Sequence, residues 1–117
     1  MADVLMVLPV VTGKSEEWRR FAQQLQGSRL IEFTDALRDL GMESLSMWLA
    51  NTQVGHISVA HFTSTRDPVD MQDMLTTSKQ PFDVWFKEYV RVLHGVDLSS
   101  MIGGLAAEHI LDWTSDA

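Results

Sequence analysis

The sequence contains no cysteine, which excludes disulfide bonds, thiolate metal sites and cysteine nucleophiles. Basic residues are scarce: nine Lys and Arg stand against 16 Asp and Glu, for a formal net charge of −7. Arg19 and Arg20 form the sole adjacent basic pair. Because this charge repels a phosphate backbone, we expect no nucleic-acid partner.

Long hydrophobic runs are also missing. A helix that spans a bilayer needs about 20 apolar residues, and no stretch of the sequence approaches that length. The amino-terminal residues lack the basic start and the small-residue cleavage site of a signal peptide. We therefore expect a cytoplasmic protein without a membrane partner.

Cofactor motifs are absent as well. The four His residues show no His-x-His or His-Glu-x-x-His spacing, and no glycine-rich phosphate loop is present. The sequence thus predicts neither a metal nor an organic cofactor. What is present is the composition of a globular protein, 45% hydrophobic and 21% charged over 117 residues, which fits one domain, residues 1–117.

The amino-terminal part predicts a strand followed by a long helical segment. Residues 4–11 are an apolar run of strand length, and Pro9 indicates a sheet edge or a bulge because proline has no backbone donor. Apolar residues then recur at helical spacing over residues 15–40, and Gly41 follows as a C-cap. Gly27 marks a point where this helix either kinks or divides into two.

The rest of the chain predicts a hairpin, two helices and a last strand. Residues 43–52 and 56–63 form the hairpin around a tight turn at Val54-Gly55. Proline residues open a short helix ending near residue 77 and a longer one over residues 81–94. Residues 107–113 read as the last strand. The order is β-α-β-β-α-β, with the second helix split.

Apolar residues occupy both faces of the first three predicted strands. In a four-stranded antiparallel sheet with helices on one side, the other face stays uncovered and is normally polar. The cheapest cover is an identical sheet from a second copy, which predicts a homodimer. The alternative is a monomer with an unusually apolar surface.

Several segments support a resemblance to a known family. They are GKSEEWR (13–19), residues 29–41, PFDVWF (81–86), HGVDL (94–98) and ILDW (110–113). The chain resembles an uncharacterised bacterial family of short dimeric α/β-barrel proteins, related to antibiotic-biosynthesis monooxygenases, polyketide cyclases and haem-degrading enzymes. The resemblance implies an α+β fold, ferredoxin-like βαββαβ with a four-stranded sheet, and a ligand pocket between sheet and helices in each subunit.

A first candidate site lies on the first helix. If that helix is continuous, Arg29 falls on its apolar stripe and Glu32, three residues further on, lies within pairing distance. A buried Arg-Glu pair facing the sheet would orient an anionic or hydroxylated ligand or tune a catalytic carboxylate. The alternatives are a structural ion pair, or a kink at Gly27 that turns both side chains outward.

A second candidate site lies on the hairpin, where the two-residue turn places Trp48 directly opposite His61. An imidazole beside an indole suits a general base and an aromatic substrate, although a lone His in a strand also serves structural roles. Trp85, Phe86 and Tyr89 on the last helix either line the cavity or belong to the core.

The two sites support a cofactor-independent enzyme as the main hypothesis. In it, His61 or Glu32 acts as the base, Arg29 stabilises developing negative charge, and Trp48, Trp85, Phe86 and Tyr89 contact a hydrophobic or aromatic molecule. Cyclase, isomerase or monooxygenase chemistry in secondary metabolism fits this arrangement. The alternative is a non-catalytic dimer that binds a ligand or fills its interior with its own side chains.

Overall fold

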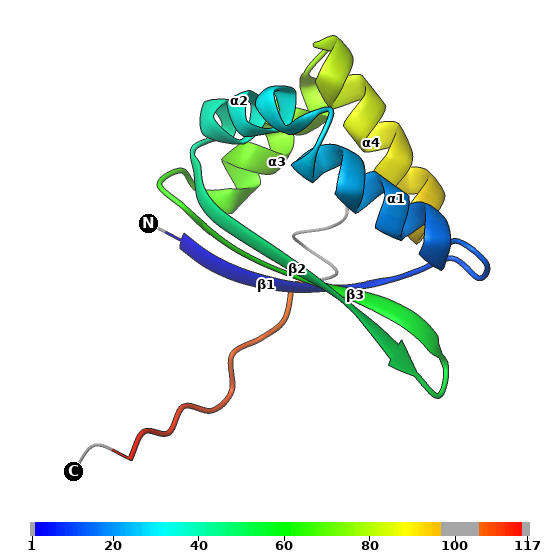
Figure 1. Cartoon of the computed structure of the whole chain (residues 1–117). Helices are drawn as coiled ribbons and strands as arrows, with labels where there is room; N and C mark the ends of the chain where they lie inside the picture. Colours follow the sequence, from blue (N-terminus) through cyan, green and yellow to red (C-terminus); the bar gives the residue numbers. More distant parts are fainter. Residues whose placement is uncertain (1, 97–105, 116–117) are drawn as a thin grey trace.

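The computed structural model describes residues 2–96 and 106–115, and in that part of the chain it is an α+β protein. A three-stranded antiparallel sheet of order β1-β3-β2 carries helices on one face (Figure 1). The elements are β1 (Ala2–Pro9), α1 (Ser15–Gln26), α2 (Leu30–Leu40), β2 (Met42–Thr52), β3 (Gly55–Ser64), α3 (Pro68–Thr77) and α4 (Pro81–His94).

Local chemistry explains most of the helix ends. The carboxylate of Asp67 accepts a hydrogen bond from the Val69 backbone N at 2.8 Å, which caps the first turn of α3. Proline opens both α3 and α4. Gly41 and Gly95 end α2 and α4 with φ angles of 86° and 69°, in the left-handed region that glycine adopts without strain. These boundaries confirm the prediction.

The long amino-terminal helix is divided in two. Gly27 ends α1 with φ −123° and ψ −104°, and a Cβ at this position would lie 3.0 Å from the Gln23 carbonyl oxygen. Arg29 then becomes the N-cap of α2. The prediction that Arg29 lies on the apolar stripe assumed one continuous helix. It therefore does not hold for Arg29 and Glu32.

The hairpin register differs from the prediction. Thr52 pairs with Gly55, so the connecting residues are Gln53 and Val54 rather than Val54 and Gly55. Trp48 lies opposite Val59, and His61 lies opposite Ser46. The predicted Trp48–His61 pairing is wrong by two residues. Because side chains alternate with a period of two, this shift leaves Trp48 and His61 on the same face.

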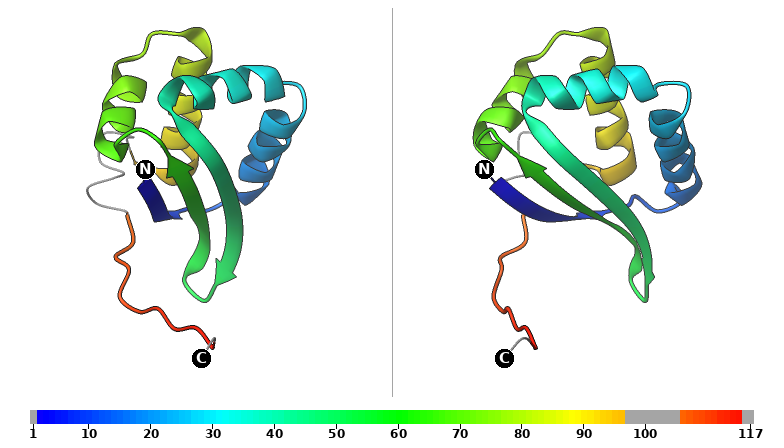
Figure 2. Two further views of the ribbon diagram at one scale, coloured as in Figure 1. Left: turned by 90° about the vertical axis from the view of Figure 1, so that its left-hand side faces the viewer. Right: turned by 60° about the vertical axis from the view of Figure 1, so that its left-hand side comes forward.

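The sheet has one face covered by helices and one open face. Leu8 and Phe62, 1% and 4% exposed, lie on the covered face and contribute to the core. Leu5, Val7 and Trp48 lie on the open face and are 41%, 39% and 53% exposed. Both views of Figure 2 show the helices on the same side of the sheet. The predicted apolar character of both faces is therefore present in the structure.

The predicted fourth strand does not form in the described residues. Residues 106–115 are an extended arm whose contact with the sheet is an isolated antiparallel bridge between Met6 and Ala106, reinforced by a hydrogen bond from Ala107 N to Leu5 O at 2.6 Å. The glycine pair at 103–104, predicted to lead into this strand, lies outside the described residues. The four-stranded sheet is thus corrected to three strands plus an arm.

Candidate functional site

An apolar cavity lies between the covered face of the sheet and helices α2, α3 and α4. Its volume is about 130 Å³, and its wall is apolar apart from Gln72, Asp83 and His94. The sheet contributes Met6, Leu8 and Phe62 to the floor. The packing of three helices over one sheet face thus leaves a small, mostly apolar space.

His94 is the buried titratable group of this wall. It is the last residue of α4, is 5% exposed, and its Nδ1 lies 2.9 Å from the Pro9 carbonyl oxygen. A carbonyl oxygen only accepts, so Nδ1 carries the proton and donates it. Burial lowers the pKa of His94, against the opposing effect of the Pro9 hydrogen bond. The ring is therefore neutral near pH 7, and Nε2 carries no proton.

His94 was predicted only as the last residue of the helix over residues 81–94, with no role in a site. A clearer signal was present: Phe82, Phe86 and Val90 precede it at intervals of four residues and all line the same cavity. Residues at this spacing share one helix face. A histidine that continues an apolar stripe into a predicted pocket is a candidate ligand or base.

Arg29 and Glu32 pair as predicted, but away from the cavity. Arg29 Nε and Nη2 donate to the two Glu32 carboxylate oxygens at 3.1 and 3.2 Å. The guanidinium lies 3.9 Å from the centroid of the Trp85 ring and 5.3 Å from that of Phe82. Neither Arg29 nor Glu32 lines the apolar cavity. The predicted orientation toward the sheet is wrong because the chain turns between α1 and α2.

His61 lies on the open face of the sheet, across the strands from the cavity. Its Nε2 contacts Asp3 Oδ1 on β1, and it shares the face with Trp48. The side chains of His61 and Asp3 are 38% and 72% exposed. The structure therefore does not bring His61 together with Arg29 and Glu32 into one site.

The three aromatic residues of α4 that were predicted to contact a ligand do not all lie at the cavity. Phe86 lines the cavity. Trp85 and Tyr89 pack on Phe21 of α1, with ring centroids 5.3 and 4.9 Å apart, and do not line the cavity. They hold α1 against α4.

A second, more open cleft of about 580 Å³ lies between α1 and β2. Its wall includes Trp18, Ala22 and Leu25 from α1, together with the five consecutive β2 residues 45–49. Side chains of consecutive strand residues point to opposite faces. The cleft therefore follows the outer edge of β2 rather than either face, and Trp48 belongs to its lining.

The described residues contain neither a metal-binding cluster nor a membrane-spanning helix. No cluster of three or more His, Asp or Glu side chains there has the geometry to hold a metal ion. No helix in residues 2–96 and 106–115 has the length and apolarity needed to cross a bilayer.

The fold and cavity define a small α+β protein of ferredoxin-like type. The structure is similar to the crystal structure of an L-rhamnose mutarotase from Formosa agariphila, with a TM-score of 0.66 and 12% sequence identity. The match covers 97% of this chain and 100% of that chain, and it confirms the predicted ferredoxin-like fold. No protein-family model and no curated protein sequence matches the chain. The relationship to monooxygenases and polyketide cyclases stays a prediction.

Proposed function

We propose that the protein binds a small apolar molecule in the cavity between the sheet and helices α2–α4. The observation that carries this proposal is the cavity wall, which is apolar except for Gln72, Asp83 and His94. In another protein, a cavity of about 150 Å³ with a similar lining stays dry and binds benzene. A volume of about 130 Å³ suits a molecule built around one six-membered ring.

We further propose isomerase-type chemistry with His94 as the proton carrier. A neutral imidazole whose Nδ1–H is held by the Pro9 carbonyl can accept a proton from substrate at Nε2 and return it to another substrate atom. Such a reaction changes no atom count and needs no cofactor. A carbonyl compound with an adjacent C–H bond is the simplest apolar substrate class for it.

The enzyme with the similar fold is an L-rhamnose mutarotase, and L-rhamnose is a sugar. A sugar presents several hydroxyl groups, and burying each without a hydrogen bond carries a free-energy penalty. Three polar side chains in the wall of this cavity supply few partners. The lining therefore favours an apolar substrate over a hexose.

Binding is tested with a cavity-filling variant. Ala36 lines the cavity from α2, whereas Ala22 on α1 lines the separate cleft. We expect Ala36→Phe to abolish the binding of cyclohexanone, measured by ligand-observed NMR, and Ala22→Phe to leave it unchanged. Native mass spectrometry of freshly purified protein reports any retained organic molecule. Binding that survives Ala36→Phe, in a protein that stays folded, contradicts the proposed cavity site.

Catalysis is tested in D₂O by proton exchange at the carbons beside the carbonyl of cyclohexanone. We expect exchange with the native protein and its loss in His94→Gln, while His61→Gln, Glu32→Gln and Arg29→Ala retain it. Loss in His61→Gln instead would restore the base predicted from the hairpin. Interconversion of L-rhamnose anomers, followed by NMR, would contradict the apolar substrate class.

We also propose a homodimer that covers the open face of the sheet. Leu5, Val7 and Trp48 leave a contiguous apolar area there, since Val7, Val59 and Trp48 are direct neighbours across the three strands. The same observation favours the second candidate function, a non-catalytic dimer module. The exchange experiment separates the two functions.

A further inference from the structure

The apolar cavity and the cleft between α1 and β2 are neighbours that share part of their walls. Phe33 of α2 and Leu45 and Met47 of β2 line both hollows. All three residues are partly buried. Methionine is unbranched and flexible, so the Met47 side chain can adapt to a molecule lying against it. A ligand whose ring occupies the cavity can therefore extend past these three residues into the cleft.

The cleft has a different chemistry from the cavity. Its volume is about 580 Å³, against about 130 Å³ for the cavity. Ala22 and Leu25 of α1 make part of its wall apolar, and Arg19, Gln26 and Ser46 add polar groups. Among the described residues, Arg19 is the one charged side chain in this lining. The cleft therefore offers a positive charge and no carboxylate.

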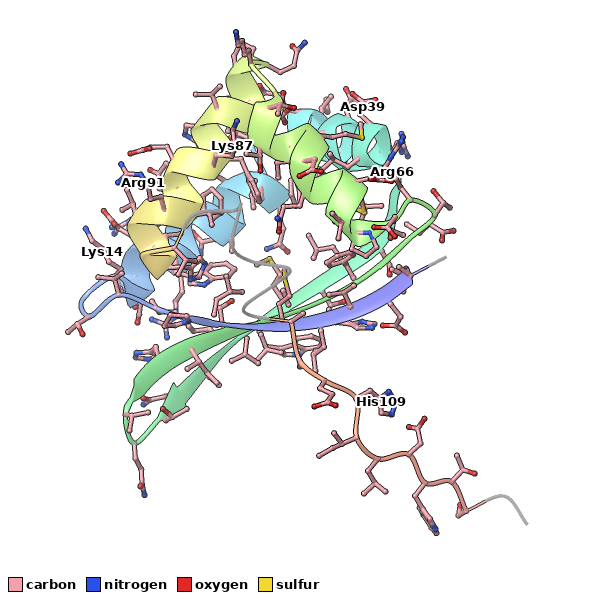
Figure 3. All side chains as sticks on the ribbon, turned by 180° about the vertical axis from the view of Figure 1, so that it is seen from behind. Lys14, Asp39, Arg66, Lys87, Arg91 and His109 are labelled. Carbon is pink, nitrogen blue, oxygen red and sulfur yellow. The ribbon has the colours of Figure 1, made fainter. Side chains whose placement is uncertain are left out.

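Arg19 is accessible to a ligand. Its Nη1 contacts Glu16 Oε1, in a pair whose side chains are 50% and 73% exposed. Exposed pairs contribute little stability, and a guanidinium carries five N–H donors. The basic residues Lys14, Lys87 and Arg91, labelled in Figure 3, line neither hollow. Arg19 is thus well placed to bind an anionic group in the cleft.

Trp18 provides a second, independent observation at the cleft. It lines the cleft and is 5% exposed, yet its indole Nε1 has no hydrogen-bond partner among the described residues. Buried indole N–H groups normally find an acceptor. The Trp18 ring packs edge-on against the ring of His94, with centroids 6.2 Å apart, and His94 lines the cavity. The unpaired donor therefore belongs to a residue that lies where the two hollows meet.

We propose that the cavity and the cleft are the two compartments of one ligand site. The ring of the ligand occupies the cavity, and an alkyl chain passes Phe33 and Met47 into the cleft. The chain ends in a carboxylate that accepts hydrogen bonds from Arg19 and from the indole N–H of Trp18. The ligand class is a six-membered ring with an acidic side chain. This inference rests on the cavity site proposed above and specifies the class of molecule that it binds.

Two probes that differ in one group test the role of Arg19. Cyclohexylbutanoate carries the acidic chain, and cyclohexylbutanol has a hydroxyl in place of the carboxylate. We expect calorimetry to give a Kd for the acid at least about tenfold below that for the alcohol. Arg19→Gln should remove this difference. Arg20→Gln, at the adjacent arginine that lines neither hollow, should retain it. A difference that survives Arg19→Gln, or is lost equally in Arg20→Gln, overturns the proposal.

Two filling variants separate this inference from the cavity site on which it rests. Ala22→Phe fills the cleft, so we expect it to raise the Kd of cyclohexylbutanoate at least about tenfold and to leave cyclohexanone binding unchanged. Ala36→Phe fills the cavity and should abolish the binding of both molecules. An unchanged Kd for cyclohexylbutanoate in Ala22→Phe overturns the two-compartment site and leaves the cavity site standing. Binding of either molecule that survives Ala36→Phe overturns both.

NMR of the native chain reports on the cleft without filling it. The chain has four Trp residues, and the indole N–H signal of Trp18 is the one missing from Trp18→Phe. We expect this signal to move downfield when cyclohexylbutanoate binds, because its proton gains an acceptor. The signal of Trp113, 80% exposed on the arm, should stay in place. A Trp18 signal that does not move at saturating ligand overturns the proposed contact.

Discussion

His94 Nδ1 donates a hydrogen bond to the carbonyl oxygen of Pro9 at 2.9 Å, across 85 positions of the sequence. The contact joins the last residue of α4 to the last residue of β1. Beside it, the Val11 backbone N donates to the Leu93 carbonyl oxygen at 2.8 Å. These two bonds fasten the last helix to the first strand at one end of the apolar cavity.

The pKa of His94 makes a prediction for stability. Burial lowers this pKa from 6.5, so at pH values below 6.5 the unfolded chain binds a proton that the folded protein does not. The contribution of His94 to the free energy of unfolding is therefore complete above pH 6.5 and is lost as the pH falls toward the lower folded pKa. Urea unfolding of native protein and His94→Gln should show a stability difference that narrows between about pH 7.5 and about pH 5.5. A difference independent of pH would contradict this account.

Arg29 should stabilise the fold through Trp85 more than through Glu32. The guanidinium lies 3.9 Å from the Trp85 ring centroid, whereas Glu32 is a half-exposed partner. We expect Arg29→Ala to lower the free energy of unfolding by about 1–2 kcal/mol, and Glu32→Gln by about 0.5 kcal/mol or less. Lys14→Ala breaks a comparable i,i+3 pair with Glu17 and serves as the control. Thermal unfolding measures the stability of the three variants. An equal loss of stability in all three would refute the stabilising role of the Arg29–Trp85 contact.

Two neighbouring residues on β1 test folding and the proposed dimerisation separately. Leu8 is 1% exposed on the covered face, whereas Val7 is 39% exposed on the open face. Leu8→Asp buries a charge without a partner and should leave the protein unfolded. Val7→Asp should leave a folded monomer, because its charge meets water once the copies part. Light scattering after size exclusion measures both; a dimeric Val7→Asp protein argues against an interface on this face.

The cap of α3 gives a local test. Asp67 accepts the Val69 N–H at 2.8 Å and stands outside both cavities. Asp67→Ala should lower the free energy of unfolding by about 1 kcal/mol. Asp67→Asn should keep most of the native stability, since asparagine caps equally well. Ligand binding should be unchanged in both. A loss of binding without a loss of stability would be the opposite of this expectation.

The elements predicted correctly are those whose ends depend on neighbouring residues. Pro68 and Pro81 begin helices, and Gly41 and Gly95 end them, for reasons that act within one turn. Pro9 indicated either a sheet edge or a bulge, and β1 is an edge of the described sheet. Local steric and hydrogen-bonding rules therefore account for the correct part of the fold.

The errors arose where distant contacts decide. Ile110 and Trp113 have the pattern of a strand, but in the described residues the arm meets β1 only at the isolated bridge between Met6 and Ala106. The turn after Thr52 sets the register of Trp48, and both candidate turns have two residues. His94 lies at the cavity because α4 packs against β1. The residues next to His94 in the sequence do not predict this contact.

The two edges of the sheet differ in length and in what they offer. The edge of β1 carries an outgoing arm, and the eleven residues of β2 form the longer edge without one. A chain with a donor at one edge and an acceptor at the other has two ways to associate. Two copies related by a twofold axis use up every arm and every free edge, whereas a translation leaves one of each at the ends and continues as a filament. The symmetry relating such copies would thus decide between a finite pair and an open-ended polymer.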